Sequence, residues 1–417
     1  MCNDLCRASN NIFFFLTHVI LIMAQPKGYI YDESKVPNYD LPEILKEETS
    51  LEKWETLRRE QIVRNFEEYV YGDAPVFMGK ITHKIVEQGS HALGKRKQIN
   101  LVISEGSKQV ELQILAYIPG NIEGPVPLFL GLNFNGNHAV TSDPAVLLPT
   151  GWVRKGAFAE NNEAREKGRG YRKSYWNIDY ILSQGYGLVT VHYGDIDPDY
   201  DDGFRNGVHS LYDNNEKKHT WGSIAAWAWG ISRIVDYLEK DEDFDHERII
   251  LMGHSRLGKA ALWAGALDQR FACVISNNSG CGGAALSRRK FGETIQRINT
   301  SFPHWFCGNL NKYNNNENEC PVDQHMLLSL IAPRGLYIAS AQDDLWADPH
   351  GEFLSLYHSS IIYEKYGFPR IQPNMPEPNK PIIGKIGYHI RVGKHAVTRF
   401  DWEQFVNFAN ANLKFSN

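Results

Sequence analysis

Short apolar runs alternate with helix-like segments over most of this chain. Segments with apolar residues at helical spacing lie at 220–239, 257–268 and 401–414. The runs themselves are apolar almost throughout, which is typical of strands buried on both faces of a parallel sheet: 126–133, 186–192, 248–252, 272–276 and 335–341. Because strands that alternate with helices pack as a sheet between helical layers, the sequence predicts an α/β sandwich.

Two earlier runs have a different pattern. Residues 98–104 and 109–119 alternate between apolar and polar side chains and are joined by a short turn. This pattern predicts an antiparallel hairpin. An antiparallel start followed by parallel strands is the arrangement of the α/β-hydrolase three-layer sandwich, with a mostly parallel central sheet. We expect residues 42–71 to add helices that pack on that core.

The N-terminus has the pattern of a secretory signal. Residues 12–23 are nearly all apolar, and a helix of about 12 residues is too short to cross a bilayer. Ala24 lies at the position of cleavage. We therefore expect residues 1–24 to be a signal peptide and 25–417 a single catalytic domain, secreted or periplasmic and free of the membrane. A retained anchor or a buried strand is the alternative.

The charge balance excludes a general nucleic-acid binder. The chain has 44 Lys and Arg against 49 Asp and Glu, a net charge of −5, whereas such a binder carries a basic surface. Cys2 and Cys6 would leave with the signal, and the pairing of the remaining cysteines stays open: Cys273, Cys281, Cys307 and Cys320. We expect no metal, no cofactor and a monomer.

The acidic segment 195–202 alternates like a calcium-binding loop. It has Tyr200 where such a loop needs glycine, and Asn206 where it needs a bidentate glutamate. A hydrogen-bonded turn network is therefore the better interpretation.

A serine lies directly between a buried run and a helix. The segment reads Gly253, His254, Ser255, Arg256. A serine on such a strand–turn–helix elbow is held out at the carboxyl edge of the sheet, and the N-terminus of the helix favours a developing oxyanion. The usual pattern is Gly-x-Ser-x-Gly, whereas here the second glycine is Gly258, one place later. We predict that Ser255 is a nucleophile, with the backbone N–H and guanidinium of Arg256 at the oxyanion.

Such a serine needs an orienting carboxylate and a base, which in this fold follow it in that order. Three acids come after the run 335–341. Asp344 is the first choice because it lies just past a late strand, Asp343 is the second and Asp348 the third. A solvated acidic loop is the alternative interpretation.

Two histidines near the C-terminus are candidates for the base. His395 lies on a loop before the last helix and is the better one, whereas His389 lies in an apolar strand-like stretch and is interpreted as packed. His254, beside the serine, is also interpreted as packing. The loop after the run 126–133 normally lends a second oxyanion donor, so residues 135–137 are expected to line the site.

Several segments resemble the glucuronoyl esterases, carbohydrate esterase family 15. Residues 253–259, GHSRLGK, are similar to the G-x-S-R-x-G-K signature of that family, and the resemblance runs from about residue 127 to the C-terminus through NFNGNH, SNNSGCGGAALSRR and ASAQDDLWADPHGEF. It implies an α/β-hydrolase that cleaves the ester between lignin alcohols and the 4-O-methyl-glucuronate branches of glucuronoxylan. It also implies Ser255 as nucleophile, His395 as base and Arg256 at the oxyanion.

The same resemblance implies a set of uronate-binding residues. Lys259 matches a lysine that hydrogen-bonds glucuronate hydroxyls. Glu293 and Trp346 match further sugar-contacting positions, and Gln296 corresponds to one in fungal members. A tryptophan in the core and a glutamate on an exposed helix are the structural alternatives.

Two departures place the chain nearer the bacterial members. Many members carry the triad acid as Glu where this chain has Asn278, so the role passes to Asp344. Fungal members have a disulfide between cysteines at positions that are His254 and Ala396 here. The alternative functions are a carbohydrate acetylesterase, such as an acetyl xylan esterase, and a non-catalytic glycan-binding relative.

Overall fold

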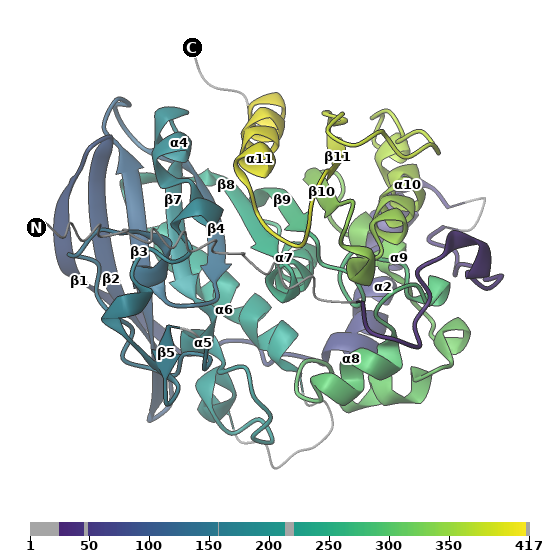
Figure 1. Ribbon diagram of the computed structural model, residues 1–417, viewed down its shortest axis with the longest axis horizontal. Helices are drawn as coiled ribbons and strands as arrows, with labels where there is room; N and C mark the ends of the chain where they lie inside the picture. The colour runs from purple at the N-terminus through teal and green to yellow at the C-terminus, as the bar shows by residue number, and fades with distance from the viewer. Residues whose placement is uncertain (1–24, 46–48, 157, 213–220, 414–417) are drawn as a thin grey trace, which may run out of the picture.

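The computed structural model describes residues 25–45, 49–156, 158–212 and 221–413, so the predicted signal peptide lies outside the described residues. Its centre is a nine-stranded sheet in the order β1-β2-β3-β7-β4-β8-β9-β10-β11 (Figure 1). The strands are β1 (Lys80–His91), β2 (Gly94–Glu105), β3 (Lys108–Pro119), β4 (Val126–Asn133), β7 (Gly187–His192), β8 (Phe244–His254), β9 (Phe271–Asn277), β10 (Gly335–Ala341) and β11 (Ile386–Arg391). A separate small hairpin joins β5 (Ala159–Glu160) and β6 (Glu163–Ala164).

The strand pairing changes once across the sheet, from antiparallel to parallel. β1, β2 and β3 pair antiparallel, and β3 pairs antiparallel with β7. From β7 to β11 every pairing is parallel. The predicted hairpin and the predicted parallel series are both confirmed. The edge strand β1 was not predicted, because it is largely exposed and its apolar side chains Ile85 and Val86 are 44% and 43% exposed, so it lacks a buried face to detect.

Helices cover both faces of the sheet. On one face α4 (Ile178–Ser183) and α11 (Arg399–Asn412) pack in one core with Phe129, and on the other α6 (Ser223–Leu238) and α7 (Arg256–Leu267) pack in a second core with Leu128 and Leu130 (Figure 1). Alternate residues of β4 thus enter different cores, which explains why the run is apolar throughout. The other helices are α3 (Lys173–Trp176), α5 (Tyr193–Ile196), α8 (Ile295–Ser301), α9 (Gln324–Ser329) and α10 (Pro349–Lys365).

The N-terminal segment adds helix to the second core over residues 51–71, within the predicted range 42–71. α1 (Leu51–Lys53) and α2 (Arg59–Phe66) join through π-helical turns into one helical stretch that ends at Tyr71. The ring of Tyr71 stacks on Trp263 of α7, with centroids 4.6 Å apart. This contact anchors the segment to the helix that follows Ser255.

Two global properties follow from the described residues. The four cysteines among them, whose pairing the sequence left open, are all buried free thiols. Within the described ranges, no helix combines the length and apolar character needed to cross a bilayer.

Candidate active site

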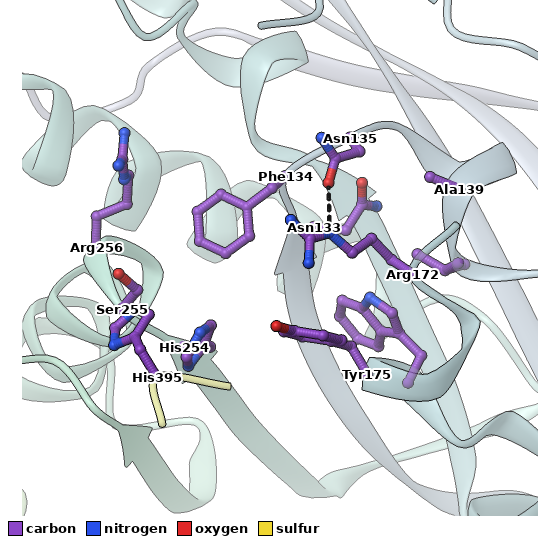
Figure 2. A pocket seen from close by; sticks show the side chains of 12 residues that line it. Asn133, Phe134, Asn135, Ala139, Arg172, Tyr175, His254, Ser255, Arg256 and His395 are labelled. Atoms are coloured by element: carbon purple, nitrogen blue, oxygen red, sulfur yellow. Dashed lines mark hydrogen bonds between the residues drawn. The ribbon is translucent and has the colours of Figure 1, made fainter. Parts of the chain in front are cut away.

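Ser255 occupies the sharp turn between β8 and α7, with φ 59° and ψ −131°. This backbone conformation is strained for any residue with a side chain. The Ser255 backbone N–H donates to the carbonyl of Asn277, 2.9 Å away, and so ties the turn to the end of β9. The strained elbow turns the Ser255 side chain into a pocket (Figure 2).

Two glycines allow this turn to be so tight. A Cβ on Gly253 would lie 2.0 Å from the carbonyl oxygen of Leu257. A Cβ on Gly258 would lie 2.9 Å from Oγ of Ser276 and 3.0 Å from Cβ of Ser279. The second glycine of the motif is therefore needed on the first turn of α7, where the helix crosses the end of β9, one place later than in the usual pattern.

His395 and Asp344 form a close pair. Nδ1 of His395 lies 2.6 Å from Oδ2 of Asp344, and because a carboxylate only accepts, the Nδ1–H is the donor. Neutral His395 then keeps a lone pair on Nε2, and its ring lines the same pocket as Ser255. Asn278 also donates to Oδ2 of Asp344, at 3.0 Å. Asn278 thus lies beside the carboxylate.

The other two candidate acids lie elsewhere. Asp343 is exposed, and its backbone N–H donates to the carbonyl of Gly393. Asp348 is buried and accepts from Nε of Arg289 at 2.8 Å. The structure therefore brings His395 to Asp344 and to neither of these alternatives.

The two other histidines belong to one buried network. His389 is fully buried and lies 2.9 Å from both Tyr337 and Asp401, as expected for a packed residue. His254 bonds through Nδ1 to Oδ1 of Asn277 at 2.6 Å, and its ring lies 4.5 Å from that of His395. Burial and then the neighbouring His395 lower the pKa of His254 well below its usual value, so it stays neutral.

Arg256 is held in place by a buried carboxylate that we did not predict for this role. Asp199 binds the Arg256 guanidinium and also accepts from Nε1 of Trp305 at 2.8 Å and Nε2 of His304 at 2.9 Å. Burial alone would raise the pKa of Asp199, but these donors and the charge of Arg256 hold it well below its usual value. Trp305 also stacks under the guanidinium, with its ring centre 4.4 Å from Cζ.

The acidic segment 195–202 is therefore the predicted turn network. Asp197 bonds to His209 at 3.0 Å, and Asp195 bonds to His192 at 3.1 Å. Together with Asp199, these carboxylates are engaged by protein groups. Among the described residues, no group of three or more His, Cys, Asp or Glu could hold a metal ion.

The pocket beside Ser255 has a volume of about 280 Å³. Of the loop predicted to line it, Asn135 does so, whereas the side chain of Asn137 turns away and donates to the carbonyl of Gln113. No periodic pattern in the sequence marks the remaining wall, which comes from the loop and short helix before α4. Arg172 and Tyr175 line it (Figure 2), together with Trp176.

The four predicted uronate residues lie outside this pocket. Lys259 is 3% exposed, donates to the carbonyls of Ser279 and Cys281 at 2.5 Å each, and has its pKa lowered by burial. Glu293 and Trp346 are half-buried neighbours, joined by a 3.0 Å backbone hydrogen bond. Gln296 is exposed on α8.

Electrostatics link two of these residues. Burial raises the pKa of Glu293, and the Lys259 ammonium and a hydrogen bond with Trp346 oppose that rise. An ammonium has three N–H donors, so Lys259 keeps one beyond its two carbonyl bonds.

The sheet order explains why the predicted uronate residues lie apart from the pocket. Glu293 and Trp346 follow β9 and β10, which lie on one side of β8, whereas the pocket is built over β4 on its other side. Ser255 stands between the two regions.

Known proteins share this sequence and fold. The family profile described as fungal glucuronyl esterase matches residues 173–367. A curated carbohydrate esterase, MZ0003, from an unknown prokaryotic organism is 44% identical over 407 residues, which are 94% of each chain. The chain belongs to carbohydrate esterase family 15.

Solved structures of that family superpose on almost the whole chain. A promiscuous family 15 esterase from a marine bacterial metagenome has a TM-score of 0.86 at 43% identity and covers 93% of this chain and 100% of its own. The glucuronoyl esterase from Solibacter usitatus has a TM-score of 0.84 at 44% identity, with 91% and 100% covered. The resemblance read from the sequence and the α/β-hydrolase fold are both confirmed, and the chain is a carboxylic ester hydrolase.

Proposed function

We propose that this family 15 enzyme is a serine esterase that hydrolyses the ester between 4-O-methyl-glucuronate of glucuronoxylan and an alcohol of lignin. The observation that carries the proposal is the strained Ser255 elbow, with Arg256 on the next residue and the His395–Asp344 pair at the same pocket. The solved glucuronoyl esterase from Solibacter usitatus, which superposes over the whole of its length, supports the same proposal.

Acylation starts at Ser255. Nε2 of His395 takes the hydroxyl proton while Oγ attacks the C6 carbonyl of the uronate. The carbonyl π electrons move to oxygen, and the oxyanion forms against the Arg256 backbone N–H at the N-terminus of α7 and against the Arg256 guanidinium. When the tetrahedral intermediate collapses, the C–O bond to the alcohol breaks and His395 returns the proton to the leaving oxygen.

Deacylation repeats these steps with water. His395 takes a proton from water as its oxygen attacks the acyl carbonyl, and then gives that proton to Oγ of Ser255. The uronic acid leaves and the serine is restored. Asp344 supports the imidazolium form of His395 in both halves of the reaction.

We assign the acyl side of the ester to the residues over β9 and β10. Lys259 offers its remaining N–H to a sugar hydroxyl, Glu293 accepts from another, and Trp346 presents a ring face to the pyranose. Gln296, which is exposed on α8, would meet a larger substrate.

A carbohydrate acetylesterase is the second candidate. It is favoured by the position of Lys259, whose ammonium already serves two backbone carbonyls and is 3% exposed. For an acetylesterase Lys259→Ala would hardly change turnover of acetylated xylan, whereas for a glucuronoyl esterase it raises KM for a glucuronate ester by about tenfold or more.

We further propose that residues 1–24 direct export and that 25–417 act as one catalytic domain. The apolar run at 12–23 followed by Ala24 supports the first point. The continuous sheet supports the second.

The mechanism is tested by release of benzyl alcohol from benzyl glucuronate. Ser255→Ala is expected to lower kcat by at least about a thousandfold while it leaves the thermal unfolding temperature nearly unchanged. Hydrolysis that survives in Ser255→Ala would contradict the assignment of the nucleophile.

A further inference from the structure

The pocket over β4 contains a cation without an anion. The guanidinium of Arg172 lies between two aromatic rings, with Cζ 4.7 Å from the ring centre of Tyr171 and 4.8 Å from that of Tyr175. Its Nε donates to Oδ1 of Asn135 at 3.2 Å (Figure 2). Among the described residues, no carboxylate forms an ion pair with Arg172, and its side chain lines the pocket.

Two neighbouring arginines differ from Arg172 in this respect. A second cavity of about 280 Å³ adjoins the first and shares Asn135, Arg172 and Arg256 with it. Arg154 and Arg256 both pair with Asp199. Among the described residues that line either cavity, none is Asp or Glu. The two connected cavities therefore carry a net positive charge to which Arg172 contributes, since Arg154 and Arg256 share the one carboxylate of Asp199 and Lys155 also lines the second cavity.

The acyl part of the ester offers no anion that could pair with the positive charge of Arg172. In an ester of a uronic acid the carboxyl group is masked, so the sugar brings no negative charge before hydrolysis. The pocket also lies across Ser255 from Glu293 and Trp346, over β4, where the alcohol part of the ester would extend. In the intact ester, an anion that reaches Arg172 would therefore belong to the alcohol.

We propose that the pocket over β4 binds the alcohol part of the ester, and that Arg172 selects aromatic alcohols that carry a carboxylate. This inference rests on the proposed esterase function. The planar guanidinium, clamped by two tyrosines, presents its Nη groups in the fork that binds a carboxylate through two hydrogen bonds. Phe134, Tyr175 and Trp176 supply apolar faces for the ring of the alcohol.

The test compares two esters of glucuronic acid whose alcohols carry either a free carboxylate or its neutral methyl ester. The alcohols are 4-carboxybenzyl alcohol and its methyl ester, 4-(methoxycarbonyl)benzyl alcohol. For the wild type, we expect kcat/KM to be about tenfold to a hundredfold higher for the carboxylate, the range of a charge-assisted hydrogen bond. In Arg172→Gln this ratio falls to near one, and in Arg172→Lys it is intermediate because the point charge remains without the fork.

The matched control is Lys173→Gln, which removes the same charge from the next residue. Lys173 lines a different groove, with His91 and Asp179, and its variant keeps the wild-type ratio. The ratio does not depend on the fraction of folded enzyme, so a poorly folded variant does not imitate the result. A wild-type ratio near one, or a ratio unchanged in Arg172→Gln, would overturn the proposal.

Binding of the free alcohol separates this proposal from the proposed function. Isothermal titration of 4-(hydroxymethyl)benzoate into Ser255→Ala needs no ester hydrolysis. We expect at least tenfold weaker binding when Arg172→Gln is added. If the wild type hydrolyses no glucuronate ester but the tenfold difference in binding is found, only the esterase function is contradicted. Equal binding by Ser255→Ala and by the double variant would contradict the role of Arg172.

Discussion

Replacing Asp344 with asparagine should lower turnover by less than the removal of a triad acid often does. Oδ2 of Asp344 accepts from two donors, Nδ1 of His395 at 2.6 Å and Nδ2 of Asn278 at 3.0 Å. In Asp344→Asn the amide oxygen takes this position, because the amide nitrogen would meet both donors. His395 therefore keeps its tautomer, and only the negative charge behind it is lost.

The size of the loss follows from that geometry. A hydrogen bond to a charged group contributes about 1.5 to 3 kcal/mol, which corresponds to a fall in kcat of about ten- to a hundredfold. Asp344→Ala leaves both donors unpaired and frees the imidazole ring. The fall in kcat of Asp344→Ala should therefore approach the roughly 10⁴-fold that is seen when the catalytic histidine is held in the wrong tautomer.

The assay is the initial rate of benzyl glucuronate hydrolysis at saturating substrate. Asp343→Asn is the matched control, since the Asp343 side chain is exposed and its backbone N–H donates to the carbonyl of Gly393. Its kcat should stay within about twofold of the wild type, because surface substitutions have small effects. An Asp344→Asn variant as slow as Asp344→Ala would refute the tautomer argument, and equal losses at 343 and 344 would refute the assignment of the acid.

Three further predictions concern stability. Burial raises the pKa of Glu352 from 4.5 to about 8, so the folded state keeps the proton at a pH where the unfolded state has already released it. The contribution of this proton to wild-type stability is therefore complete below about pH 4.5 and is lost as the pH rises to 8. The difference in unfolding temperature between Glu352→Gln and wild type should widen from pH 5 to 8 and then level off, and a constant difference would contradict this. Asp199→Ala should lower the free energy of unfolding in urea by about 3 to 5 kcal/mol because Arg256 loses a buried partner, and a loss no larger than that of an exposed aspartate would disprove it. Gly253→Ala should cost about 1 to 3 kcal/mol or more in the same assay, since its Cβ would lie 2.0 Å from the carbonyl of Leu257, and an unchanged midpoint would count against the tight elbow.

The sequence predicts those parts of the fold that are buried on both sides. Leu128 and Phe129 enter different cores, so β4 reads as a continuous apolar run, and its neighbours do the same. An exposed edge strand such as β1 gives no comparable pattern, since Ile85 and Val86 are both partly in solvent. Periodicity therefore finds the centre of the sheet and misses its margin.

A similar division applies to the candidate site. Ser255, Asp344 and His395 each follow a parallel strand, and because such strands end at one edge of the sheet, their chain order is enough to bring them together. Asp199 and Arg172 lie on long connections whose course depends on tertiary packing. Their roles depend on contacts with distant residues, which no local pattern in the sequence records.

The central claim is that Ser255 is the nucleophile that hydrolyses glucuronate esters. Its most direct test is the ratio of kcat/KM for a methyl ester of 4-O-methyl-glucuronate to kcat/KM for acetylated xylo-oligosaccharides, with Ser255→Ala as the background. We predict a ratio well above one, with both activities lost in Ser255→Ala. A ratio below one, or glucuronate ester hydrolysis that persists without the serine, would contradict the account.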